Sequence, residues 1–115
     1  MIEIESIVYA LPEQVVSNDD LKATYPDWEM DELYRKTGVA SRHIAAPNET
    51  AVDLAERACH ELIAKGYDLE YDFDTLIFCT ETPDHQIPPN SGVLHGRLKM
   101  PQTVCAFDIS IGCSG

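Results

Sequence analysis

Basic residues are scarce in this chain: 8 Lys and Arg stand against 20 Asp and Glu in 115 residues, a formal net charge of -12. A chain with so little positive charge offers no basic stripe to nucleic acid and no attraction to an anionic membrane surface. It also has no apolar run near the roughly 18 residues of a membrane span. Its N-terminus carries acids where a signal peptide has bases. We therefore expect a cytoplasmic protein, kept soluble by its acidity, with no nucleic acid and no membrane among its partners.

The sequence also lacks the spacings of the common cysteine, metal and phosphate sites. None of its four cysteines forms a CxxC pair, its four histidines have no metal-ligand spacing, and it contains no glycine-rich phosphate loop. No metal site and no disulfide framework are expected. Cys79 and Cys105 lie in apolar strand-like runs and Cys59 lies on an apolar helix face, so these three are expected as small core residues.

What the chain does have is a regular alternation of apolar patterns. Strands are expected at residues 2–10, 75–80 and 103–109, and helices at 18–24, 30–36 and 51–65. A further helix, capped by Asn90 or Ser91, is expected to run to about residue 98. Two helix starts carry capping boxes, Ser17 with Asp20 and Thr50 with Asp53. Gly38 ends the second helix, and residues 39–49 are expected as a loop or an extended excursion. This order predicts a layered α/β fold with a largely parallel sheet.

The last ten residues hold the strongest chemical signal. An apolar run from Val104 to Phe107 passes through Asp108 into a turn of small residues that bears Cys113. Backbone N–H groups at a helix start stabilise a thiolate, and small neighbours let a substrate carbonyl approach an oxyanion hole. Cys113 is therefore either a nucleophile or a buried structural cysteine, and the short string Gly-Cys-Ser-Gly leaves both interpretations open.

A second candidate is the segment of residues 35–50. It holds three of the eight bases, Arg35, Lys36 and Arg42, within eight residues. In so acidic a chain it is the one place that could attract a phosphate, unless it is an ordinary solvated loop. His85 lies on the loop after the second predicted strand, where it either borders a site or is simply exposed.

Three segments of the chain are distinctive in combination. They are Leu11-Pro12-Glu13-Gln14-Val15 with Asn18-x-x-Leu21, then Thr37-Gly38-Val39 with the run from Arg42 to Thr50, then Ala106-Phe107-Asp108 with the turn that bears Cys113. In this order they resemble the N-terminal part of the β-ketoacyl-acyl-carrier-protein synthases III, of the thiolase-like superfamily. The resemblance covers essentially the whole chain but only the first third of a typical member.

The resemblance implies a fold of two similar α/β halves stacked in five layers, αβαβα, with mixed, mostly parallel sheets and usually a homodimer. Residues 1–115 would be the N-terminal part of the first half, an incomplete domain. Taken alone, this segment would be inactive and poorly folded. The runner-up interpretation is a non-catalytic fragment or interaction piece.

The resemblance also implies a reaction. Cys113 would take an acyl group from a coenzyme A thioester, and a malonyl thioester on acyl carrier protein would then decarboxylate and attack the acyl-enzyme. Coenzyme A would be carried by the substrate, so no permanently bound cofactor is expected. The histidine and asparagine that polarise the malonyl carbonyl in the family match positions beyond residue 115, and no histidine of this chain is assigned to that role.

The family binds coenzyme A through the pattern Trp-x-x-x-Arg-Thr-Gly. Thr37 matches it, Lys36 stands for the arginine, and Glu32 stands for the tryptophan; Trp28 lies four residues too early unless a local gap restores it as an adenine platform. Trp28, Lys36 and Thr37 are thus the expected cofactor-binding residues. This departure leaves a carrier-protein thioester as an alternative donor.

A second departure concerns the turn itself. The family more often has Ala-Cys-Ala-Gly, whereas Gly112 and Ser114 flank the cysteine here. The difference suggests a specialised relative, and transfer of the acyl group to an alcohol or amine without decarboxylation is a further alternative.

Overall fold

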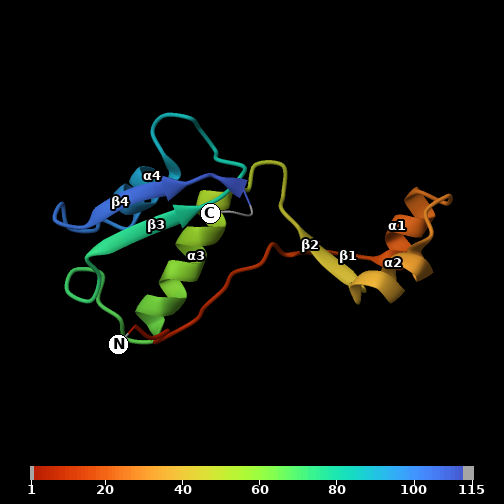
Figure 1. Cartoon of the computed structure of the whole chain (residues 1–115), viewed down its shortest axis with the longest axis horizontal. Coiled ribbons are helices and arrows are strands. Elements are labelled where there is room, and N and C mark those ends of the chain that lie inside the picture. The colour runs from red at the N-terminus through yellow and green to blue at the C-terminus, as the bar shows by residue number, and fades with distance from the viewer. Residues whose placement is uncertain (1, 113–115) are drawn as a thin grey trace. The chain divides into compact units, whose positions relative to one another are not determined.

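The computed structural model describes residues 2–112, which form two compact units. One unit is Leu11–Asn48, and the other joins Met1–Ala10 to Glu49–Gly115. Figure 1 shows the helices and strands of both units. The chain is a mixed α/β structure, as the sequence predicts, with one antiparallel and one parallel pair of strands among the described residues.

The unit Leu11–Asn48 is built on a short antiparallel pair. Strand β1, Gln14–Ser17, pairs with β2, Ser41–Ile44, and between them lie the helices α1, Asn18–Thr24, and α2, Met30–Thr37. The capping box at the start of α1 is confirmed, because the Ser17 hydroxyl accepts from the Asp20 N–H and the Asp20 carboxylate accepts from the Ser17 N–H. Gly38 ends α2 with φ 71°, in the left-handed region that favours glycine.

The other unit contains the parallel pair. Its elements are α3, Ala51–Ala64, β3, Thr75–Cys79, α4, Asn90–Arg97, and β4, Cys105–Ile109. Strands β3 and β4 pair in parallel, from Thr75 with Cys105 to Cys79 with Ile109, and α4 connects them. Val52 of α3, Phe78 of β3 and Leu94 of α4 form a buried cluster, so both helices cover one face of this sheet. The capping box at Thr50 and Asp53 is confirmed at the start of α3.

The opposite face of the β3–β4 sheet is open in the described part of the chain. Ile77 and Phe107 are register partners on this face, and their side chains are 55% and 42% exposed. Because side chains alternate between the faces of a strand, Cys79 and Cys105 share this open face and are exposed. The prediction that these two cysteines are core residues is therefore wrong for the described structure. Cys59 does pack against the core, and its burial raises the pKa of its thiol.

One strand prediction in the N-terminal half is wrong, and one strand was not predicted. Residues 2–10 form no strand, since no described segment pairs with them; the Lys65 ammonium donates instead to the Ser6 hydroxyl and the Ile7 carbonyl, at 3.3 and 3.2 Å. A strand requires a ladder of hydrogen bonds to a neighbour, which an apolar pattern alone does not supply. Conversely, the expected excursion of residues 39–49 contains β2, which finds its neighbour in β1.

Candidate active site

The candidate active site is the edge where the two parallel strands end. The Thr80 N–H donates to the Ile109 carbonyl at 3.1 Å, which carries the ladder one residue past β3. Because β3 and β4 are parallel, the loops that follow them leave the sheet at the same edge, the usual place for a ligand in an α/β sheet. Cys113 lies outside the described residues. The residue directly before it, Gly112, belongs to the loop that leaves β4 at this edge.

An acidic side chain on β4 is bonded to the helix that precedes it. The two oxygens of Asp108 accept hydrogen bonds from consecutive backbone N–H groups, that of Asn90 at 2.8 Å and that of Ser91 at 2.7 Å. These two N–H groups are in the first turn of α4, where a helix leaves its donors without intrahelical partners. Asp108 thus satisfies donors of two residues that are fully buried, each with 0% exposure.

This arrangement corrects the expected cap of α4. The sequence predicts that Asn90 or Ser91 caps the helix with its own side chain, but both lie within the first turn and the N-cap residue is Pro89, which has no side chain to accept a hydrogen bond. The Asn90 amide oxygen instead accepts from the Asp84 N–H at 3.1 Å, which fixes the loop that enters the helix. The sequence does not reveal that Asp108 caps α4, because the N–H donors lie 17 and 18 positions away.

The charge of Asp108 fits its position at a helix start. Desolvation raises the pKa of this carboxyl, but hydrogen bonds from Ser91 and from the Asn90 backbone outweigh it, and the net effect lowers the pKa below its ordinary value of 3.8. Asp108 is therefore ionised at neutral pH. A carboxylate at the N-terminus of a helix also interacts favourably with the helix dipole.

A second carboxylate lies beside the turn itself. Gly112 has φ 65°, and a β-carbon at this position would stand 3.2 Å from a carboxylate oxygen of Glu81. The left-handed backbone favours glycine over the alanine that is more frequent in the resembled family. Glu81 was not singled out from the sequence, although it follows β3 as Gly112 follows β4, and loops after parallel strands meet at one edge.

The histidines in the described part of the chain lie among groups that give them no evident catalytic role. Each of three has a partner nearby: His43 with the Pro12 carbonyl, His60 with the Glu56 carboxylate at 4.0 Å, and His95 with the Pro101 carbonyl at 3.0 Å. His85 is exposed on the loop between β3 and α4, as its sequence position suggested. Within residues 2–112 no three potential metal ligands come together.

The three expected coenzyme A residues lie in the unit Leu11–Asn48. Trp28 is 51% exposed and stacks on Tyr25, with ring centroids 4.5 Å apart and planes 15° from parallel. Trp28 precedes α2, whereas Lys36 and Thr37 are at its C-terminal end, so the roughly 12 Å length of an eight-residue helix separates them. The structure therefore does not bring Trp28 together with the other two residues.

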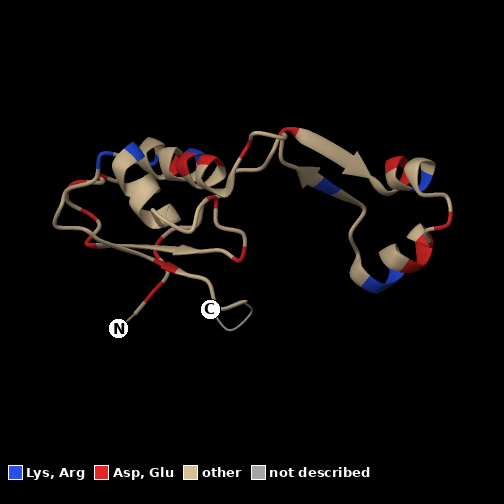
Figure 2. Ribbon diagram, turned by 90° about the horizontal axis from the view of Figure 1, so that it is seen from above, with Lys and Arg blue, Asp and Glu red and all other residues tan. Residues whose placement is uncertain are grey.

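The local partners of Lys36 and Thr37 are within α2. The Lys36 ammonium pairs with Glu32 at 2.6 Å, and the Thr37 hydroxyl donates to the Leu33 carbonyl at 2.8 Å. Arg42, the third base of this region, donates to Asn18 and to the Val16 carbonyl. By sequence, Asp and Glu outnumber Lys and Arg in both units, and Figure 2 shows where these residues lie on the ribbon. The positive charge that a phosphate would need is thus partly neutralised by Glu32.

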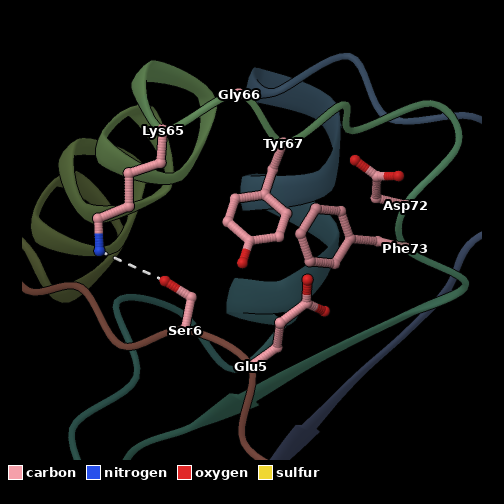
Figure 3. A pocket seen from close by; sticks show the side chains of 7 residues that line it. All are labelled: Glu5, Ser6, Lys65, Gly66, Tyr67, Asp72 and Phe73. Atoms are coloured by element: carbon pink, nitrogen blue, oxygen red, sulfur yellow. Dashed lines mark hydrogen bonds between the residues drawn. The ribbon is translucent and has the colours of Figure 1, made fainter.

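A polar hollow elsewhere in the molecule is a poorer candidate. Figure 3 shows its lining: Glu5, Ser6, Lys65, Gly66, Tyr67, Asp72 and Phe73. Asp72 and Phe73 lie directly before β3, which places the hollow toward the amino end of that strand, whereas the turn before Cys113 follows the carboxyl end of β4. A five-residue strand is about 16 Å long. The hollow therefore does not belong to the candidate active site.

Known proteins resemble this chain in both sequence and structure. A β-ketoacyl-acyl-carrier-protein synthase III of Methylococcus capsulatus is 37% identical over 108 residues, which cover 91% of this chain and 32% of the relative. A crystal structure of a 3-oxoacyl-acyl-carrier-protein synthase III matches 97% of this chain and 33% of its own, with a TM-score of 0.87 and 43% identity. A tetronic acid condensing enzyme matches 94% of this chain and 35% of its own, with a TM-score of 0.76 and 30% identity.

These matches confirm the resemblance and the thiolase-like fold. The chain spans about a third of the length of the curated relatives that it matches. No family model matches it. None of the helices in residues 2–112 is long and apolar enough to cross a membrane.

Proposed function

We propose, from the premise that this chain is a relative of the N-terminal third of the β-ketoacyl-acyl-carrier-protein synthases III, that the intact protein is an acyltransferase with Cys113 as its nucleophile. The observation that supports this most directly is the edge of the β3–β4 sheet. There β4 ends in a glycine-bearing turn directly before Cys113, and the fold to that point matches a solved synthase III with a TM-score of 0.87.

In the first half-reaction, Cys113 accepts an acyl group. The thiol loses its proton as its sulfur attacks the carbonyl carbon of an acyl thioester, and the bond to the donor's sulfur breaks so that the donor thiol leaves with a proton. Since one thioester replaces another, the exchange is close to balanced in energy. The backbone N–H of Cys113 serves as one donor of the oxyanion hole that stabilises the tetrahedral intermediate.

In the second half-reaction, a malonyl thioester on acyl carrier protein supplies the attacking carbon. Its carboxylate leaves as carbon dioxide, and the electron pair of the broken carbon–carbon bond forms the new bond to the acyl carbon. Cys113 departs as a thiolate and regains a proton. Loss of carbon dioxide drives the condensation, and acyl carrier protein is accordingly the proposed protein partner.

The acyl donor is proposed to be a coenzyme A thioester, with Trp28, Lys36 and Thr37 on the binding surface. Their arrangement supports this only in part, because Lys36 is paired with Glu32 and Trp28 is stacked on Tyr25 before α2. A comparison of one acyl group on coenzyme A and on acyl carrier protein decides between the two donors. A lower rate for Lys36→Ala with the coenzyme A donor alone would identify Lys36 as a phosphate contact.

A second candidate is transfer of the acyl group to another acceptor, such as an alcohol or amine. It is favoured by the turn, where glycine replaces the family's usual alanine beside Glu81. Release of carbon dioxide from malonyl-acyl carrier protein separates the two, since only the decarboxylating reaction produces it. Cytoplasmic location and a homodimer complete the proposal, by analogy with the resembled family.

The test is acyl capture by the intact protein. After incubation with an acyl-coenzyme A or an acyl-acyl carrier protein, mass spectrometry of the peptides should find the acyl mass on Cys113 and on none of Cys59, Cys79 and Cys105. Cys113→Ala should abolish it, and Cys105→Ala, which removes an exposed thiol on the open sheet face, should not. Equal labelling of all four cysteines, or labelling that spares Cys113, would refute the assignment.

A further inference from the structure

Two hydrogen bonds between β4 and α4 join residues that are far apart in the sequence. Asp108 lies on the strand that leads to Cys113, while the N–H groups of Asn90 and Ser91 belong to the helix that connects the two parallel strands. Both carboxylate oxygens are used, each on its own N–H. Two bonds from one rigid planar group to two consecutive N–H groups fix both the position and the rotation of Asp108 relative to α4.

Two neighbouring hydrogen bonds attach the loop between β3 and α4 to the same part of the sheet. The Asn90 amide oxygen holds the loop before α4 through the Asp84 N–H, and the Ile109 carbonyl, one residue after Asp108, accepts from the Thr80 N–H. The loop between β3 and α4 is therefore held at two points, at Thr80 by the residue after Asp108 and at Asp84 by Asn90, whose own N–H is bonded to Asp108. Five positions later in the chain stands Cys113.

We propose that Asp108 is a positioning residue for the acyl-transfer reaction: its two hydrogen bonds to the N-terminus of α4 fix where the chain leaves β4, and so where the Cys113 thiol stands. The inference rests on the proposed function of Cys113. A reacting sulfur must approach the thioester carbon closely and in line, and a displacement of about 1 Å can lower a rate on the order of a hundredfold.

A helix can be capped by residues at its own start, without a neighbouring strand. The use of β4 at α4 therefore indicates a role besides helix stability. Helix α3 of the same unit is capped by Thr50 and Asp53 at its own start. At α4, by contrast, Pro89 offers no acceptor and Asn90 and Ser91 are buried in the first turn. The acceptor comes from the cysteine-bearing strand, and the helix and the turn are thereby held in one fixed relation.

The test compares two carboxylates that cap helices in the intact protein, Asp108→Asn at α4 and Asp53→Asn at α3. Both variants should lower Tm, because each loses a charged cap. Only Asp108→Asn should slow acylation of Cys113 by an acyl thioester, by about tenfold or more. It should also change the rate at which iodoacetamide alkylates Cys113 at every pH of the profile. Equal acylation rates for the two variants would overturn the proposal.

Asp108→Glu separates positioning from capping and decides the matter if Asp108→Asn does not fold. It keeps the charge at the helix start but lengthens the side chain by one methylene group, which moves the strand or the oxygens. We expect a Tm close to that of the wild type together with acylation slowed about tenfold. Wild-type acylation in Asp108→Glu would show that Asp108 is a cap only.

The proposed function and this inference can fail separately. If wild-type Cys113 is not acylated by any thioester, the proposed function is wrong. The positioning role of Asp108 is then tested by the rate at which iodoacetamide alkylates Cys113. An unchanged iodoacetamide rate of Cys113 in both Asp108 variants, measured against Cys59 as an internal reference for opening of the core, would contradict the positioning role.

Discussion

Helices α3 and α4 cover the same face of the β3–β4 sheet, yet their N-termini are capped in opposite ways. Thr50 and Asp53, three residues apart, cap α3 within one turn of chain. Asp108 caps α4 from the far strand, 17 and 18 positions away. A local cap stabilises one helix, whereas a distant cap also ties that helix to another element. The start of α4 is thereby attached to the strand that leads to the candidate active site, whereas the cap of α3 is made within its own first turn.

The largest effect is expected from Asp108→Ala. It leaves the N–H groups of two fully buried residues without an acceptor, and each such group costs about 1–3 kcal/mol. We expect the free energy of unfolding of the intact protein to fall by about 2–4 kcal/mol in urea titrations followed by circular dichroism. If the free energy of unfolding falls no more than for a surface substitution, water replaces the carboxylate as acceptor at no cost in stability.

Thr50→Ala is the matched change at the other helix. It removes the hydroxyl that accepts from the Asp53 N–H, and loss of such a cap costs about 1 kcal/mol. The same titration should show this smaller loss, and acylation of Cys113 should be unchanged. Slower acylation of Cys113 in Thr50→Ala would contradict this difference, because both helix starts would then affect the reaction.

A local cap can be introduced at α4 to separate helix stability from the position of the strand. Pro89 has φ -65° and ψ 154°, an N-cap conformation that serine adopts without strain. In the Asp108→Ala background, Pro89→Ser should restore about 0.5–1 kcal/mol of stability but leave Cys113 acylation slow. Recovery of the acylation rate along with stability would show that any cap suffices.

The smallest effect is expected on acidification. Arg97 first, and then hydrogen bonds from Thr50, lower the pKa of Asp53 from 3.8 to about 2, and the pKa of Asp108 is also lowered. Each contribution is present above the unfolded-state pKa and is lost as the pH falls through the folded-state value. Tm should therefore decline between about pH 4 and pH 2, and Asp53→Asn should flatten part of that decline. An identical decline in Asp53→Asn would exclude a role for Asp53 in it.

The features predicted best from the sequence are those that depend on residues close together in the chain. The capping boxes of α1 and α3 and the left-handed Gly38 depend on residues within one turn of each other, and all three are confirmed. The helix and strand order of residues 51–109 was likewise predictable from apolar periodicity.

What the sequence could not give depends on partners far along the chain. Strand β2 was missed because β1 supplies its hydrogen bonds, and the strand expected at residues 2–10 lacks such a partner among the described residues. Cys79 and Cys105 were assigned to the core because an apolar run does not tell which face of a sheet is covered. Within the candidate site, the resemblance pointed to Cys113, but Asp108 and Glu81 acquire meaning only when the strands are set side by side.

The most direct test of the account is the turnover of the intact protein with alanine at position 113. Formation of the acylated product should be followed with an acyl thioester and malonyl-acyl carrier protein, beside the wild type. Cys113→Ala should lose product formation and form no acyl-enzyme, while its Tm stays near that of the wild type. Full turnover by Cys113→Ala would contradict the claim that this thiol carries the acyl group.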